Sequence, residues 1–210
     1  MRALLFDVFG TCVDWRSSVM RECEARGLPA SLADAWRGRY QPQLETVRSG
    51  ARPWTTLDVL HREALVGLVN VDDPEELTRV WHRLDPWPDT VEGLSRLKRK
   101  YVIAPCSNGH IALLVNLAKY AGLPWDAILG AEIAHAYKPQ PAAYLGSVAA
   151  LGLEPGEVMM VAAHNADLAA AAACGLRTAF VPRATEDTEA TANWDIVATD
   201  FLDLASQCGA

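Results

Sequence analysis

The sequence has no long apolar run, no paired-cysteine pattern and no excess of positive charge. No stretch approaches the length needed to span a membrane, and the chain begins without the architecture of a signal peptide. Its five cysteines show no C-x-x-C spacing, so neither a disulfide framework nor a zinc site is indicated. They are Cys12, Cys23, Cys106, Cys174 and Cys208. This cysteine usage predicts a reducing, cytoplasmic location.

The charge balance argues against a nucleic-acid partner. The formal net charge is -7, and Lys and Arg are nowhere concentrated enough to offset it. The one basic cluster, residues 96–100, comes at the end of a predicted helix, where it complements the helix dipole. The chain of 210 residues, half of them apolar (50%), is long enough for one substantial core, with or without a smaller inserted unit.

The first apolar segment ends in a carboxylate. Leu4, Leu5 and Phe6 are followed by Asp7, and a glycine comes shortly after. Such a run, bounded by a glycine turn, predicts a strand buried on both faces, as in a parallel sheet. Asp7 then lies at the carboxyl end of the strand, where open α/β sheets bind their ligands. A half-desolvated carboxylate there is a candidate nucleophile, base or metal ligand, although Asp also commonly caps such turns.

The rest of the chain changes from helices to alternating strands and helices. From about residue 15 to residue 84, apolar residues recur at helical spacing and no strand is indicated. Further along, strands are predicted at 101–106, 127–129, 158–161, 176–181 and 194–197, with helices between them and a loop at 184–193. This order predicts a parallel sheet with right-handed crossovers and a helical insertion after the first strand. The insertion would lie over the strand ends and close the site against water.

Polar residues follow several of these strands. Ser107 and Asn108 follow the strand at 101–106, Asp167 follows a later strand, and Lys138 comes just before a helix. Each alone has a structural explanation, as a turn residue, a helix N-terminal acid or a surface lysine. Together at one sheet edge they suit covalent catalysis by a carboxylate. The lysine keeps that carboxylate ionised, and the serine and asparagine fix its orientation.

Four segments, in this order, resemble the four motifs of the haloacid dehalogenase superfamily. They are Asp7-Val8-Phe9-Gly10-Thr11, Ser107-Asn108-Gly109, Tyr137-Lys138-Pro139 and the segment that contains Asp167. The resemblance covers essentially the whole chain. It implies a Rossmann-like three-layer α/β/α core with a parallel sheet, made of residues 1–13 and 89–210. An all-helical cap, residues 14–88, is inserted after the first strand.

Phe9 decides which branch of the superfamily the chain resembles. The superfamily phosphatases carry a second aspartate at this position, which protonates the leaving alcohol, and an apolar ring cannot do so. A halide leaving group needs no proton. Phe9 therefore favours the L-2-haloacid dehalogenases, to which residues 14–16 and 36–37 are also similar. The alternatives are a magnesium-dependent small-molecule phosphatase of the same superfamily and a non-catalytic binding protein on this fold.

The resemblance implies hydrolytic dehalogenation of short 2-haloalkanoic acids, as by an (S)-2-haloacid dehalogenase. Asp7 attacks the halogen-bearing carbon and forms an ester, and water then hydrolyses this ester to release a 2-hydroxy acid. The partners are the small-molecule haloacid and the halide product, and fluoroacetate stays open as a substrate. Neither a metal nor a cofactor is expected. A homodimer formed through the cap is compatible with the resemblance.

The motif match also assigns roles to individual residues. Thr11 and Ser107 contact the Asp7 carboxylate or the substrate acid, and Asp167 holds Lys138 or the hydrolytic water. The expected substrate- and halide-binding residues are Arg37, with Arg16 as its alternative, and Val8, Phe9, Asn108, Tyr144, His164 and Asn165. The aromatic residues expected to wall a narrow pocket are Phe9, Trp15, Trp36, Tyr40 and Trp54.

The fourth motif departs from that of the better-known family members. Where they carry a serine and an asparagine, this chain has Ala162, Ala163, His164 and Asn165. The alanines remove a hydroxyl that could order the hydrolytic water. His164 and Asn165 offer replacements, because a histidine can act as a base near neutral pH. The alternative is a histidine that is merely satisfied by loop contacts.

Overall fold

The computed structural model describes residues 1–210 and is built around a five-stranded parallel sheet. The strands are β1 (Ala3–Phe6), β4 (Val102–Pro105), β5 (Val158–Ala162), β6 (Arg177–Phe180) and β7 (Ile196–Val197). Their order is β4-β1-β5-β6-β7, and all neighbouring strands pair in parallel. β1 is flanked on both sides, with Leu5 opposite Ala104 and Met160. The predicted parallel α/β sheet is confirmed.

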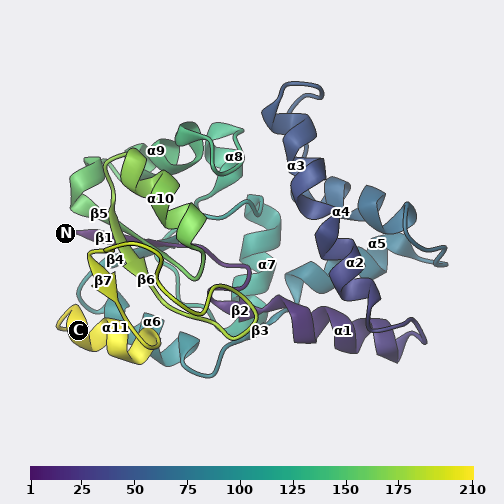
Figure 1. The fold of residues 1–210 in the computed structure, drawn as a ribbon, viewed down its shortest axis with the longest axis horizontal. Helices are drawn as coiled ribbons and strands as arrows, with labels where there is room; N and C mark the ends of the chain where they lie inside the picture. Colours follow the sequence, from purple (N-terminus) through teal and green to yellow (C-terminus); the bar gives the residue numbers. More distant parts are fainter.

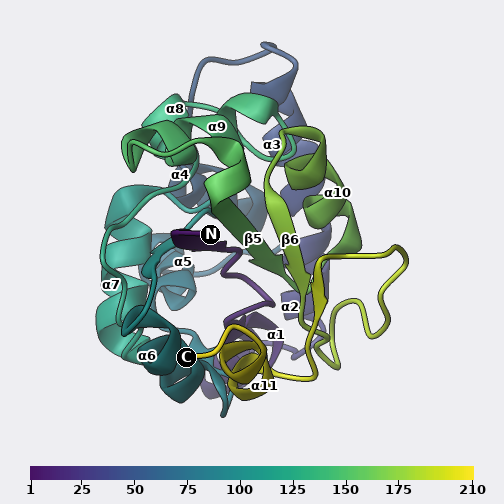
Figure 2. The same ribbon diagram turned by 90° about the vertical axis from the view of Figure 1, so that its left-hand side faces the viewer.

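Helices cover both faces of this sheet, because successive side chains of β1 point to opposite faces. Leu4 and Phe6 pack in one core cluster with α6, α7 and α11, whereas Ala3 and Leu5 pack in a second cluster with α9 and α10. Figure 2 shows helices on either side of the strands, in the expected three-layer arrangement. The core helices are α6 (Thr90–Lys98), α7 (Ile111–Ala121), α8 (Ala131–Ala134), α9 (Pro141–Ala150), α10 (Asn165–Ala173) and α11 (Phe201–Gln207), with the 3₁₀-helix η2 (Pro155–Glu157).

An all-helical cap is inserted after β1 and lies beside the sheet, on the right in Figure 1. It consists of α1 (Trp15–Ala25), α2 (Leu32–Gly38), α3 (Tyr40–Arg48), α4 (Leu57–Val66), α5 (Pro74–Thr78) and the 3₁₀-helix η1 (Arg79–His82). The chain passes between core and cap through two short strands, β2 (Val13–Asp14) and β3 (Asp85–Pro86), which pair antiparallel. No helix of the chain combines the length and the apolar character that crossing a membrane requires.

The strand expected at residues 127–129 is not formed. β4 is the edge strand of the sheet, and Asp126 bonds to the backbone of β4 in place of a further strand. The Asp126 N–H donates to the Ile103 carbonyl and the Ile103 N–H donates to the Asp126 carboxylate, both at 2.9 Å. The carboxylate thus satisfies the backbone donor that a further strand would have used. The apolar pattern of this segment reflects packing instead, because Leu129 is buried in the second core cluster.

The cap encloses an aromatic cluster that contains a buried histidine. His61 packs against Trp81, with ring centroids 4.2 Å apart, and lies edge-on to Trp36. It is 3% exposed, and neither ring nitrogen has a hydrogen-bond partner. Burial, assisted by the positive charge of Arg37, lowers the pKa of His61 to about 3. The imidazole is therefore neutral in the folded protein at physiological pH.

We predict that the variant His61→Leu is less sensitive to acid than the wild type. In the unfolded chain the imidazole takes up a proton below its ordinary pKa of 6.5, whereas in the folded protein it does so only near pH 3. Stability linked to His61 is therefore complete above pH 6.5 and is lost as the pH falls toward 3. Between about pH 8 and about pH 5, urea denaturation should show that the wild type loses about 2 kcal/mol more unfolding free energy than His61→Leu. An equal loss in both proteins would contradict a neutral buried His61.

Candidate active site

Asp7 lies at the carboxyl end of β1, and two donors hold one of its carboxylate oxygens. Thr11 Oγ1 donates to Asp7 Oδ2 at 2.8 Å, and His164 Nδ1 is 3.2 Å from the same oxygen. The Ala163 N–H donates to Thr11 Oγ1 at 2.9 Å, so the hydroxyl proton of Thr11 is left to point at Asp7. Asp7 is only 8% exposed. The sheet edge therefore presents a nearly buried carboxylate in a fixed orientation.

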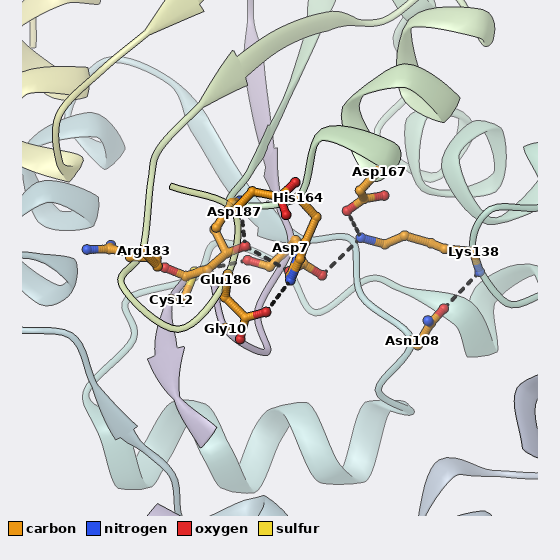
Figure 3. Close-up of polar contacts among 12 residues, drawn as sticks. Asp7, Gly10, Cys12, Asn108, Lys138, His164, Asp167, Arg183, Glu186 and Asp187 are labelled. Atoms are coloured by element: carbon orange, nitrogen blue, oxygen red, sulfur yellow. Dashed lines mark hydrogen bonds and ion pairs between the residues drawn. The ribbon is translucent and has the colours of Figure 1, made fainter. Parts of the chain in front are cut away.

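The ammonium group of Lys138 lies between two carboxylates (Figure 3). Its Nζ is 3.1 Å from Asp7 Oδ1 and 2.5 Å from Asp167 Oδ2. Burial raises the pKa of Asp7, but the charges of Lys138 and His164 outweigh burial and hold that pKa well below its usual range. The charges of Asp167 and Asp7 likewise raise the pKa of Lys138, against the effect of burial. Asp7 and Lys138 therefore face each other as an ion pair.

Tyr144 and Asn108 fix the positions of these charges. Tyr144, in the first turn of α9, donates to Asp167 Oδ1 at 2.6 Å. Asn108 Oδ1 accepts the backbone N–H of Lys138 at 2.8 Å, while Asn108 Nδ2 donates to the Tyr40 hydroxyl at 2.8 Å. Because both ends of its amide are engaged, Asn108 connects the lysine segment to the cap.

His164 bridges Asp7 and a glutamate from the loop after β6. His164 Nε2 is 2.8 Å from Glu186 Oε2, and Trp15 Nε1 donates to Glu186 Oε1 at 2.7 Å. Burial lowers the pKa of His164, but hydrogen bonds and charge interactions with Asp7 and Glu186 prevail and raise that pKa to about 10. The imidazole is therefore a cation at neutral pH. At Gly10 (φ +89°) a side chain would collide with Glu186, so the glycine makes room for this contact.

An active-site cavity of about 370 Å³ is lined by residues of both the core and the cap. The core contributes Asp7, Phe9, Asn108, Lys138, Pro139, Tyr144, His164, Ala166 and Asp167, and the cap contributes Arg37, Tyr40, Gln41 and Arg48. Phe9 is the apolar part of this wall beside the nucleophile candidate, and its ring packs edge-on against Trp81 at 6.1 Å. No group of three or more His, Cys, Asp or Glu side chains in the chain is arranged to bind a metal ion.

The three tryptophans expected in the cavity wall lie elsewhere. Trp36 is buried inside the aromatic cluster of the cap, Trp15 stacks on another tryptophan, and Trp54 stacks on a histidine outside the cavity lining. Large apolar rings gain more by full burial than by lining a wet cavity, and this accounts for the buried Trp15 and Trp36. Trp54 is only half-buried and lies against His135. Phe9 and Tyr40 do line the cavity, as predicted.

Arg37 presents an unpaired donor in the cavity wall, and Arg16 does not. The guanidinium carbon of Arg37 is 4.1 Å from the ring centre of Tyr40, and its Nη1 is buried without a hydrogen-bond partner. A buried cationic donor without a partner costs free energy, which a bound anion would recover. Arg16 instead forms two hydrogen bonds with the exposed Asp34 and lies outside the cavity lining. The geometry therefore favours Arg37 over Arg16 as an anion contact.

Three further predicted site residues lie outside the cavity lining. The Asn165 side chain donates to the Asp187 carboxylate at 2.8 Å, so it fixes the loop after β6 and does not reach the cavity. Val8 is fully buried in the core cluster. Ser107 Oγ is buried and has no hydrogen-bond partner, so the expected contact between Ser107 and the Asp7 carboxylate is not made.

Three charged residues near the site were not predicted from the sequence, namely Arg48, Arg183 and Glu186. Arg48 lines the cavity and donates to the Lys138 carbonyl at 2.8 Å. Arg183 is 8% exposed, donates to the Thr11 carbonyl at 2.9 Å and forms two hydrogen bonds with Asp89. None of the three residues belongs to a motif. The only feature of the sequence that could have indicated Arg183 and Glu186 is the high density of charged residues at 183–189.

Comparisons with known proteins find relatives that match this chain in sequence and in fold. Residues 1–175 match the family model of the haloacid dehalogenase-like hydrolases. The (S)-2-haloacid dehalogenase 4A of Burkholderia cepacia is 31% identical over 194 residues, which cover 87% of this chain and 84% of that protein. The crystal structure of the L-2-haloacid dehalogenase PA0810 is 46% identical, with a TM-score of 0.95, and the match covers 100% of this chain and 99% of that one. A defluorinating L-2-haloacid dehalogenase is 47% identical, with a TM-score of 0.93 and coverage of 100% and 96%.

We predict that Arg183→Leu strongly destabilises the fold, whereas Arg16→Leu does not. Loss of Arg183 removes the donor to the Thr11 carbonyl and two donors to the Asp89 carboxylate, which keeps the hydrogen bond from the Phe201 N–H. Removing one partner of a buried pair should lower the unfolding free energy by about 3–5 kcal/mol. The matched control removes an exposed pair with Asp34 and should leave the denaturation midpoint nearly unchanged. Urea denaturation of both variants measures the difference, and similar midpoints would contradict a structural role for Arg183.

Proposed function

This chain belongs to the haloacid dehalogenase-like hydrolases, and from that premise we propose that it is an (S)-2-haloacid dehalogenase. It hydrolyses short 2-haloalkanoic acids to 2-hydroxy acids and halide. The observation that carries this proposal is Phe9, which lines the cavity beside the ionised Asp7 at the position of the phosphatase general acid. A phosphatase without that acid cannot protonate an alcohol leaving group, whereas a halide leaves without a proton.

In the first step Asp7 attacks the carbon that carries the halogen. Asp7 Oδ2 has two donors, Thr11 and His164, whereas Oδ1 has only Lys138. Oδ1 therefore keeps a free lone pair and is the attacking atom. The ion pair with Lys138 keeps this oxygen ionised, and its fixed orientation favours attack in line with the carbon–halogen bond. The reaction inverts the carbon centre and leaves an ester on Oδ1.

Arg37 receives the departing halide. Its buried Nη1 has no partner, and its guanidinium is held against the Tyr40 ring. This preorganised positive charge stabilises the anion as it forms, in a site that the cap shields from water.

The substrates are small acids. The cavity of about 370 Å³ is shared among the substrate, the halide and water, and Phe9 and Tyr40 form part of its wall. One of the similar structures is a defluorinating L-2-haloacid dehalogenase that is 47% identical. We therefore include fluoroacetate beside chloroacetate and L-2-chloropropionate as a substrate of this protein.

We further propose the boundaries of core and cap, a dimeric assembly and a cellular location. The cap comprises residues 14–88 and the core residues 1–13 and 89–210. The protein forms a homodimer through the cap. All five cysteines are free thiols, and this supports a reducing, cytoplasmic location.

The first test measures halide release from L- and D-2-chloropropionate, chloroacetate and fluoroacetate, with a chelator present and no magnesium. We expect release from the L-isomer and the haloacetates, and no release from the D-isomer. Asp7→Asn should abolish release because the nucleophile is gone, while circular dichroism shows that the fold survives. Halide release that persists in pure Asp7→Asn would contradict the covalent mechanism. Cleavage of para-nitrophenyl phosphate with magnesium, without any halide release, would support the phosphatase alternative.

The second test concerns Arg37. Arg37→Leu should lower kcat for L-2-chloropropionate by about 10²–10³, as expected for loss of one donor to a developing anion. The matched control is Arg39→Leu, which changes an exposed arginine two residues along the chain and should leave kcat unchanged. Equal activities of the two variants would contradict the role of Arg37 in halide binding.

A further inference from the structure

Asp7 Oδ2 is contacted by two donors, Thr11 and His164, of which Figure 3 shows His164 between Asp7 and Glu186. Thr11 Oγ1 lies 2.8 Å away and His164 Nδ1 lies 3.2 Å away. Both donors are themselves fixed: the Ala163 N–H directs the Thr11 hydroxyl, and Glu186 binds the far nitrogen of the His164 ring. Oδ2 is therefore the oxygen of Asp7 that keeps its partners through the whole reaction.

The donors on Asp7 Oδ2 also bear on hydrolysis of the ester, a role that rests on the proposed function. If the ester forms on Oδ1, then Oδ2 becomes its carbonyl oxygen. We propose that Thr11 and His164 form an oxyanion hole for hydrolysis of the ester, with Glu186 as the positioning residue that holds the His164 ring. A carbonyl oxygen gains negative charge as water attacks, and two preorganised donors stabilise that charge. His164 is thus a charged donor and not the base that removes a proton from water.

The surroundings of His164 keep it charged when Asp7 is alkylated. Esterification removes the negative charge of Asp7, which is one of the two groups that raise the pKa of His164. Glu186 is the other, and it stays in place because Trp15 binds its second oxygen. The pair Lys138 and Asp167 lies on the Oδ1 side of Asp7, and the two other charged residues of the cavity lining, Arg37 and Arg48, belong to the cap. The imidazolium is consequently held by a carboxylate that takes no part in the chemistry.

Hydrolysis of the ester breaks the bond that alkylation formed on Oδ1 and returns Asp7 to its carboxylate form. The water oxygen bonds to the carboxyl carbon of Asp7, and the carbonyl electron pair moves onto Oδ2, where Thr11 and His164 stabilise it. The pair then returns, and the bond between the carboxyl carbon and Oδ1 breaks. Oδ1 leaves as the hydroxyl oxygen of the 2-hydroxy acid with one proton of the water. The other proton is released as Asp7 becomes a carboxylate again, which restores its pairing with Lys138.

The local sequence fits this assignment. Ala162 and Ala163 offer no side-chain donor, so the polar side-chain contacts of Oδ2 are the hydrogen bond from Thr11 and the ion pair with His164. Gly10 leaves the space that the Glu186 carboxylate fills beside the nucleophile loop. The fourth motif therefore replaces a neutral hydroxyl with a cation that is tied to an acidic loop residue.

The experiment separates the two half-reactions in a single turnover of L-2-chloropropionate. Rapid quenching follows halide release, which reports alkylation, and lactate formation, which reports hydrolysis; intact-protein mass spectrometry detects the ester. We expect His164→Gln to release about one equivalent of halide and then to form lactate about 10²–10³ times more slowly than the wild type. The ester should accumulate on Asp7. Glu186→Gln should also slow hydrolysis more than alkylation, but by a smaller factor than His164→Gln does.

Matched controls and opposing outcomes are available in the same assay. His135→Gln and Glu189→Gln change exposed residues outside the cavity and should leave both rates unchanged. If His164→Gln and Glu186→Gln slow both half-reactions equally and no ester accumulates, their role is structural and the oxyanion hole is refuted. Hydrolysis at the wild-type rate in His164→Gln would refute it as well. Absence of halide release from the wild type would overturn the proposed function itself, and the oxyanion hole with it.

Discussion

The ammonium group of Lys138, held between Asp7 and Asp167, is the interaction on which the site depends. Two carboxylates at the buried end of a parallel sheet would repel each other and favour protonation. The charge of Lys138 keeps the pKa of Asp7 well below its usual range, whereas burial still raises the pKa of Asp167. Core and cap both hold this residue, because Asn108 binds its backbone N–H and Arg48 binds its carbonyl. Docking of the cap therefore fixes the charge that keeps the nucleophile ionised.

The core and the cap contribute different parts of the chemistry. Parallel strands end at one edge of the sheet, and this topology alone brings Asp7, Ser107 and His164 together from distant parts of the sequence. The cap supplies Arg37, whose unpaired donor is kept in place by the Tyr40 ring. Cationic groups thus lie on both the core side and the cap side of the cavity, while the apolar Phe9 takes the place of the phosphatase general acid. Such a site suits a leaving group that departs as an anion.

The sequence predicted Asp7 and Asp167 because their positions after strands follow from local periodicity, and it predicted Lys138 from its motif at the start of a helix. The three side chains meet in the structure. What it could not predict depends on contacts between distant segments. Glu186 and Arg183 lie in an irregular loop, and nothing local indicates that they reach His164 and the Thr11 carbonyl. The error at 127–129 has a similar cause, since one Asp126 side chain replaces the pairing of a whole strand. Asn165 lies at a motif position, but its side chain binds Asp187 in the loop after β6 and therefore does not reach the cavity.

The most direct test of a covalent ester on Asp7 follows the source of the oxygen in the product. Excess enzyme is allowed a single turnover of L-2-chloropropionate in water labelled with a heavy oxygen isotope, and the lactate and the peptide that contains Asp7 are analysed by mass spectrometry. The account predicts unlabelled lactate and label in the Asp7 carboxylate, because Oδ1 leaves with the product and water replaces it. Labelled lactate with an unlabelled Asp7 would show that water attacks the substrate directly and would contradict the account.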